Sequence, residues 1–305
     1  MLRLLLFALV SLLLFTSSAL AQKPKQTNPQ ASTSQSALVR TTTRREVRRF
    51  DFGDGLTIYG APRGSVTIEA WSRPEVEIIA DIELRAATEE DLAKLAAVNN
   101  FLIDEDTTRL RILTVGTHDR KYLRRVAKDF PKRLLTADWK IDYRLRVPTL
   151  VDLDVNVGQG NLKLSGTEGA LAINLIDGDV HLTLAGGDVV ATVGRGNVIL
   201  RPLMRSWRGR GIELRLASGD LNLQLPPDFN AELAAEILRQ GGIVNSYGAL
   251  ASTNSPLDRS GEPQQASTSQ RHLRGRFGAG GAALNITIGD GTLRIAPAVV
   301  TSGSN

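Results

Sequence analysis

A ten-residue phrase that returns along the chain constrains the fold more than any other feature. It consists of an alternating apolar run, a Gly-Asn or Gly-Asp pair, and a second alternating run. Residues 155–164 read VNVGQGNLKL, and the phrase returns at 173–182, 191–200 and 214–223. A more distant copy, ITIGDGTLRI, occupies residues 286–295. The first three pivot glycines lie 18 residues apart, so the chain repeats one supersecondary unit.

The phrase predicts two short strands joined by a sharp corner. Alternation of apolar and polar residues over a short run is the signature of a strand with one buried face. Glycine before Asn or Asp supplies the positive φ that a sharp corner needs. We therefore predict equivalent structural corners at five glycines: Gly160, Gly178, Gly196, Gly219 and Gly291.

Two all-β architectures accommodate such units. In a β-solenoid, a parallel β-helix-like stack of short strands, each unit is one coil, and apolar residues such as Val157 and Leu175 stack on their equivalents in adjacent coils. In an antiparallel β-sandwich, each Gly-Asn or Gly-Asp would instead be a hairpin turn. The constant interval between the first copies favours the solenoid.

The repeats resemble those of the bacterial putative-adhesin family of β-strand-repeat proteins known as DUF4097. The resemblance rests on the repeated phrase after Val147-Pro148, on the segment GSVTIEAWSRPEV at residues 64–76, and on the ending at 278–295. It covers about residues 45–296. The resemblance implies an exported, β-solenoid-like protein with an adhesive or surface role, and it carries over no catalytic residues.

The segments outside the repeats predict an exported chain with one folded domain. Residues 1–21 contain Arg3, an apolar run and a small-residue cleavage site, which is typical of a secretory signal peptide. Residues 22–43, rich in Gln, Ser, Thr and Pro, are expected to be a disordered linker. The repeat domain then spans 44–296, and a flexible tail, 297–305, follows it. We expect the protein in the periplasm, at the cell surface or outside the cell, or membrane-anchored if the signal peptide is retained.

Two helical insertions and one polar loop interrupt the strands. Residues 88–99 begin with a threonine followed by three acids, which predicts a capped helix. Residues 118–135 form a basic segment, and residues 251–275 form a polar loop. If the basic segment is helical, three apolar residues four positions apart share one of its faces: Tyr122, Val126 and Phe130.

The formal net charge of +5 is concentrated in clusters. A basic amphipathic helix can rest on an anionic membrane surface or on an acidic polymer. The candidate contacts with such a surface are five residues of the basic segment: Arg120, Lys121, Arg124, Arg125 and Lys128. The alternative is that the apolar stripe packs on the solenoid and that the charges are merely solvated. Nucleic acid is not an expected partner of an exported protein.

No residue pattern predicts a metal site, a cofactor or a catalytic nucleophile. The chain has no cysteine, and its histidines, His118, His181 and His272, lack the spacing of metal ligands. The Gly-Asp corners are similar to those of calcium-binding β-rolls, but Asn161 and Asn197 replace half of the acids. We therefore interpret each Asn or Asp as a turn residue that bonds its own backbone.

Two functions remain. The first is a non-enzymatic protein of the cell envelope or surface, an adhesin or scaffold, that binds envelope polysaccharide, an anionic membrane surface or other envelope proteins. The second is a polysaccharide-active enzyme on a β-helix, for which Asp152 with Asp154 and Asp177 with Asp179 would supply paired carboxylates. Acids gathered in one groove would favour the enzyme, and their absence would favour the binding protein.

Overall fold

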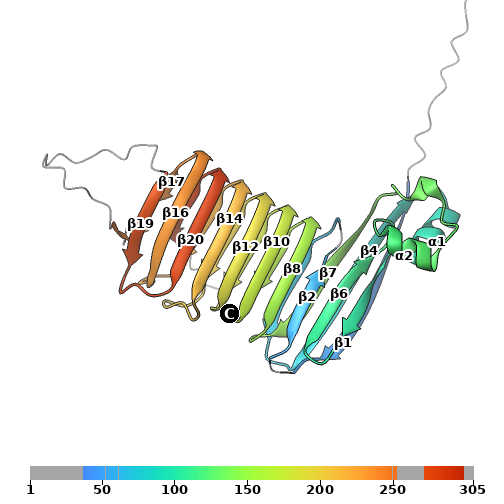
Figure 1. Cartoon of the computed structure of the whole chain (residues 1–305), viewed down its shortest axis with the longest axis horizontal. Helices are drawn as coiled ribbons and strands as arrows, with labels where there is room; N and C mark the ends of the chain where they lie inside the picture. The colour runs from blue at the N-terminus through green and yellow to red at the C-terminus, as the bar shows by residue number, and fades with distance from the viewer. Residues whose placement is uncertain (1–36, 52, 61, 249, 253–270, 299–305) are drawn as a thin grey trace, which may run out of the picture. The chain divides into compact units, whose positions relative to one another are not determined.

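The computed structural model describes residues 37–51, 53–60, 62–248, 250–252 and 271–298. The predicted signal peptide, most of the predicted linker, the centre of the polar loop and most of the tail lie outside these residues. Within them, strands dominate and helices are few and short, which confirms the all-β prediction (Figure 1). No helix of the described residues is long and apolar enough to cross a membrane.

The strands form two sheets, named here sheet A and sheet B. Sheet A has ten strands in the spatial order β1 (Leu38–Arg49), β4 (Glu75–Ala86), β7 (Trp139–Pro148), β3 (Val66–Trp71), β9 (Leu162–Ser165), β11 (Val180–Leu184), β13 (Val198–Pro202), β15 (Leu221–Leu225), β21 (Leu293–Pro297) and β17 (Ile243–Asn245). Sheet B has eleven strands in the order β18 (Leu250–Ser252), β19 (His272–Phe277), β16 (Ala231–Gln240), β20 (Ala283–Asp290), β14 (Gly211–Ser218), β12 (Asp188–Arg195), β10 (Ala170–Asp177), β8 (Asp152–Gln159), β2 (Gly55–Tyr59), β6 (Arg109–Val115) and β5 (Asn100–Glu105).

Neighbouring repeats pair in parallel and in register, so the repeats form a β-solenoid. Equivalent positions of the phrase pair across sheet B in the order Val155, Ile173, Ala191, Leu214 and Ile286. The predicted alternative, an antiparallel sandwich, is wrong for the repeats, because each Gly-Asn or Gly-Asp corner leads the chain into the other sheet. Antiparallel pairing occurs only toward the ends of the two sheets, for example between β1 and β4 and between β16 and β19.

The core lies between the two sheets. The inward positions of each phrase are apolar and buried, as at Val157 and Leu175 in sheet B and Leu182 and Leu200 in sheet A. Burial of each such side chain contributes roughly 1.5–3 kcal/mol. Because every coil covers the apolar face of its neighbour, the stack is stabilised by packing alone, without disulfides.

The order of the coils in the stack differs from their order in the sequence. The last coil, formed by β20 and β21, lies between the coil of β14 and β15 and the coil of β16 and β17. At the other end, the coil of β2 and β3 lies between that of β6 and β7 and that of β8 and β9. The repeat pattern did not indicate either rearrangement.

The first helical insertion is α1 (Glu89–Val98), whose capping residue Thr88 accepts a hydrogen bond from the N–H of Asp91. Helix α1 packs on β4 and β1 and buries Leu92 and Leu95.

The second insertion is shorter than the sequence predicts. Helix α2 spans Arg120–Val126, and a separate 3-10 turn, η1, spans Lys132–Leu134. The predicted apolar stripe is wrong: Leu123 is the buried residue, whereas Val126 is 48% exposed. The reason is that the helix ends at Ala127, with φ −149° and ψ 75°, so Phe130 does not continue the same face.

Two predicted boundaries also differ from the structure. Strand β1 begins at Leu38, so residues 38–43 belong to sheet A and not to the linker. Their polar composition concealed a strand that pairs along its whole length with β4, where Thr43 also hydrogen-bonds Asp81 at 2.6 Å. The predicted polar loop, 251–275, overlaps β18 and β19 at its two ends.

Candidate functional site

The five predicted corner glycines occupy equivalent positions in adjacent coils. Their φ angles lie between 134° and 145°, a region that favours glycine. Adjacent glycines also lie almost in contact. A Cβ on Gly178 would lie 2.1 Å from the carbonyl oxygen of Gly160, and a Cβ on Gly196 would lie 1.9 Å from that of Gly178. The corner therefore requires glycine for two independent reasons.

The residue after each corner glycine binds the next coil. Oδ1 of Asn161 accepts a hydrogen bond from the N–H of Asp179 at 3.0 Å, and Oδ1 of Asp179 accepts one from the N–H of Asn197 at 2.8 Å. Asn197 and Asp220 continue this ladder. The predicted bond to the residue's own backbone is thus replaced by a bond between coils, and Asn and Asp alternate because both supply the same acceptor atom.

These bonds bear on the calcium and enzyme hypotheses. Asp179 is occupied by the ladder, and Asp177 lies 3.3 Å from Arg195 of the next coil, so neither acid is without a partner. The described residues contain no group of three or more His, Cys, Asp or Glu side chains that could hold a metal ion.

The five basic residues predicted to meet an anionic surface lie on and just after α2, and we call them the basic cluster. The helix is fixed by its capping residue Asp119, whose Oδ1 accepts hydrogen bonds from the N–H groups of Tyr122 at 3.0 Å and Lys121 at 2.9 Å. These bonds lower the pKa of Asp119. The cap is therefore ionised at neutral pH, and the burial of Leu123 holds the helix against the domain.

The basic cluster is exposed, and its charge is uncompensated within the described part of the chain. No ion pair reaches any of its five side chains there. The nearby Arg133 differs, because its guanidinium binds both carboxylate oxygens of Asp91 at 2.5 and 2.7 Å and lowers the pKa of that acid. The acids of α1 are also engaged elsewhere, Glu89 by Arg40 and Glu90 by Lys94.

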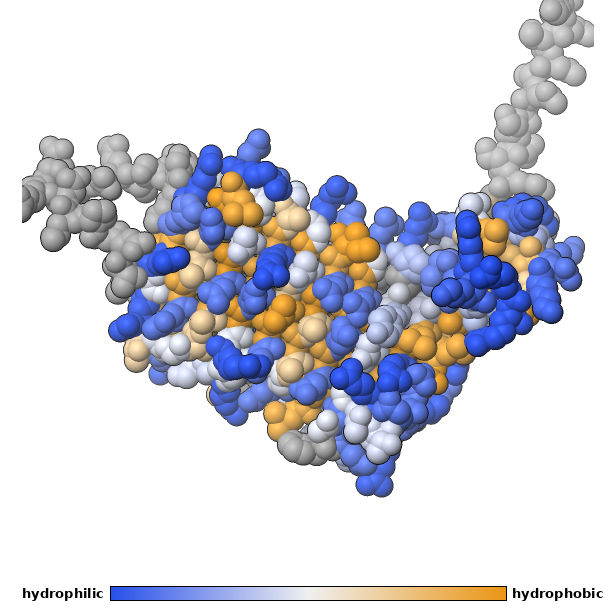
Figure 2. All heavy atoms as spheres, viewed as in Figure 1, coloured by the Kyte–Doolittle hydropathy of each residue, from blue (hydrophilic) through white to orange (hydrophobic). Residues whose placement is uncertain are grey.

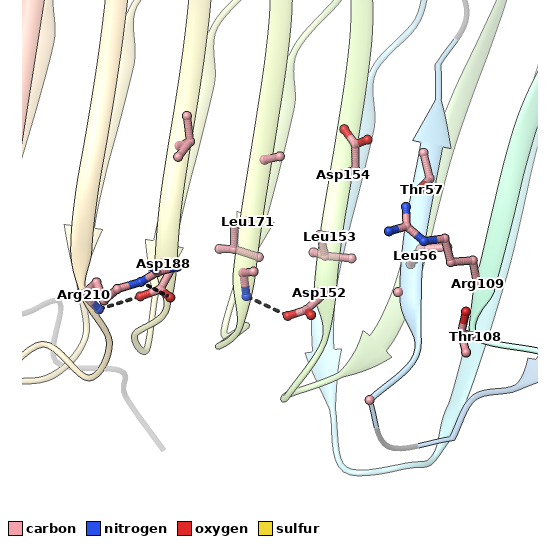
Figure 3. Close-up of a pocket in the computed structure, with 15 residues that line it drawn as sticks. Leu56, Thr57, Thr108, Arg109, Asp152, Leu153, Asp154, Leu171, Asp188 and Arg210 are labelled. Atoms are coloured by element: carbon pink, nitrogen blue, oxygen red, sulfur yellow. Dashed lines mark hydrogen bonds and ion pairs between the residues drawn. The ribbon is translucent and has the colours of Figure 1, made fainter.

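A groove of about 510 Å³ crosses the outer face of sheet B, and we call it the sheet B groove (Figure 3). It exists because small residues such as Gly55, Ala170 and Ala172 occupy outward positions of adjacent strands. Arg109 and Arg210 lie toward its two ends in Figure 3.

Three carboxylates line this groove: Asp152 and Asp154 from β8 and Asp188 from β12. Each has a structural partner. Oδ1 of Asp152 accepts the N–H of Ala170 at 2.8 Å, and Oδ1 of Asp154 accepts the amide of Asn156 at 2.8 Å. The backbone N–H and the guanidinium of Arg210 bind Asp188 and lower its pKa, so this acid is ionised and unsuited to donate a proton in general acid catalysis.

The sequence analysis singled out the Asp152–Asp154 pair but missed the groove and the contribution of Asp188. The available signal was the small size of the outward residues on successive strands. That signal becomes legible only when the strand phase and the parallel register are known, because the register places Ala172 beside Asp154 and Val190.

No family model matches the sequence, and no functionally characterised relative is detectable. Two solved structures are similar to it. One is described as a putative cell adhesion protein from Clostridium sporogenes, with 9% identity, a TM-score of 0.40, and coverage of 85% of this chain and 100% of that chain. The other is described as a putative adhesin from Bacteroides fragilis, with 10% identity, a TM-score of 0.32, and coverage of 84% and 97%. At these TM-scores, neither likeness bears on the function of this chain.

Proposed function

We propose that the protein is an exported, non-enzymatic component of the cell envelope or cell surface that binds anionic envelope polymers or lipid surfaces through the basic cluster. The main support is the basic cluster itself: five exposed cations with no acidic partner among the described residues. The solenoid behind it is a regular scaffold whose recurrent glycines and Asn or Asp residues serve the stack.

Electrostatics makes an anionic partner the natural ligand. Five like charges on and beside one short helix repel each other, and an anionic surface relieves that repulsion. Near an anionic membrane, each Lys or Arg contributes about 1 kcal/mol. The exposed side chain of Val126 lies on the same helix and adds an apolar contact at a lipid interface.

The test is charge reversal within the basic cluster. Reversing Arg124, Arg125 and Lys128 to Glu is expected to weaken binding to phosphatidylglycerol vesicles or to an acidic polysaccharide by about a hundredfold or more. Vesicle sedimentation and retention on the immobilised polysaccharide measure the two ligand sources separately, and high salt should weaken either interaction.

A matched control reverses three cations that also lack an ion pair but lie elsewhere, Arg73, Lys163 and Arg274. It changes the net charge equally and should retain most of the binding. Equal losses in the two variants would show that net charge, not the basic cluster, attracts the ligand, and would contradict the proposal.

A second candidate is a polysaccharide-active enzyme, because three carboxylates share the sheet B groove. It requires a carboxylic acid that donates a proton to the leaving group. Release of reducing ends from a polysaccharide, abolished by both Asp152→Asn and Asp154→Asn, would replace the non-enzymatic proposal. Absence of turnover alongside salt-sensitive binding would support it.

A further inference from the structure

We propose that the sheet B groove binds an extended, uncharged polysaccharide chain. The site is separate from the basic cluster and does not depend on the function proposed for that cluster. Figure 2 views the outer face of sheet B, and the helices lie toward one end of the sheets and leave the coils uncovered.

The groove is long enough for a polymer. A neighbouring hollow of about 290 Å³ shares Asp188, Val190 and Arg210 with it, and a third of about 320 Å³ shares Ala283 and Asn285 with the second. Together they cross sheet B from β6 to β19. At a spacing of about 4.8 Å per strand, this path is roughly 40 Å long. It runs across the strands, so a ligand would meet the same structural position in successive coils.

The floor of the groove is set by strand register. One row of outward residues runs through Thr57, Asp154, Ala172, Val190 and Glu213, each paired with the next. The side chains at its centre are short, so the floor combines small apolar surfaces with isolated polar groups. Such a surface can contact the C–H faces of sugar rings while hydrogen-bonding their hydroxyl groups.

The polar groups of the groove retain free bonding capacity. Asp152 and Asp154 each use Oδ1 within the protein, and no hydrogen bond from the described residues reaches Oδ2 of either acid. Arg109 has no ion pair among the described residues. The carboxylate oxygens can accept bonds from hydroxyl groups, and Arg109 can donate bonds to hydroxyl or ring oxygens.

The charges of the groove select against other partners. Three carboxylates face two arginines, Arg109 and Arg210, so the acids repel an anionic polymer and no strong net charge attracts one. An added peptide strand is also excluded from the floor, because backbone groups of the central strands are paired with both neighbours. Large aromatic anchors, typical of protein–protein hot spots, do not line this groove.

The test compares two outward alanines of equal burial class. Ala172→Trp fills the sheet B groove, whereas Ala296→Trp places the same bulk on the outer face of sheet A. Isothermal titration calorimetry with a mixed-linkage β-glucan, a galactomannan and a dextran should detect binding of at least one by the parent protein. Ala172→Trp should raise its Kd by about tenfold or more, and Ala296→Trp should not.

Two further measurements keep the proposal refutable. Asp154→Ala, a smaller change, should weaken binding several-fold even if Ala172→Trp fails to fold. Charge reversal of the basic cluster and high salt should both leave the affinity unchanged. The proposal is overturned if none of the three polysaccharides binds, if both tryptophan variants lose binding equally, or if high salt abolishes it.

Discussion

Replacing Gly178 by alanine tests whether the close approach of adjacent corners holds the stack together. Two costs arise. The φ of 145° is unfavourable for alanine and costs about 1–3 kcal/mol. The new Cβ would also lie 2.1 Å from the carbonyl oxygen and 2.6 Å from the carbonyl carbon of Gly160, so the two coils must move apart. Overpacking of this kind costs a further 1–3 kcal/mol or so, which gives a total loss of about 2–6 kcal/mol.

Gly53 provides a control that separates the two costs. Its φ is 92°, but a Cβ built on it would meet no heavy atom within 4 Å. Gly53→Ala should therefore show the backbone cost alone. Urea unfolding followed by circular dichroism gives the free energy of unfolding of each variant, and the m-value reports whether the native stack has loosened. If the two alanine variants lose equal stability, the contact between glycines does not hold the corner, and the reasoning is wrong.

Two other predictions concern hydrogen bonding and acid stability. Asp179→Ala removes the acceptor for the N–H of Asn197 and should cost about 1–2 kcal/mol, whereas Asp179→Asn keeps an equivalent oxygen and should cost little; thermal unfolding of both variants decides this. Bonds from Arg210 lower the pKa of Asp188, as those at the α2 cap lower that of Asp119. The stability from these acids is present above their unfolded pKa of about 3.9 and is lost as pH falls through the lower folded values. A melting temperature that rises on acidification below pH ~4 would contradict this.

The repeats were predictable from sequence because their determinants are local. The alternation around Gly178 fixes which residues face inward, and a constant interval aligns those residues in successive coils. The start of β1 was hidden because residues 38–43 are polar, and they form a strand only through pairing with β4. The apolar stripe of α2 was misread because helix length depends on where Ala127 leaves the helix, which a four-residue spacing cannot reveal.

The candidate sites differ in the same way. The basic cluster is a run of neighbouring residues, so composition identified it. The sheet B groove combines Asp152 with Asp188 and Arg109, which meet only because distant strands share a register and because β6 lies beside β2. A surface assembled across coils cannot be read from any one segment of the sequence.

The position of the last coil has a consequence for how the protein is synthesised. Strands β20 and β21 leave the ribosome after all other strands of the stack, yet Ile286 pairs with Leu214 on one side and with Ala235 on the other. The order of translation is therefore not the order of assembly. The coil of β16 and β17 cannot reach its final place until the chain behind it has been completed, since a later segment must occupy the space between. Loss of residues 283–297 would leave two unpaired faces inside the stack rather than one shorter stack.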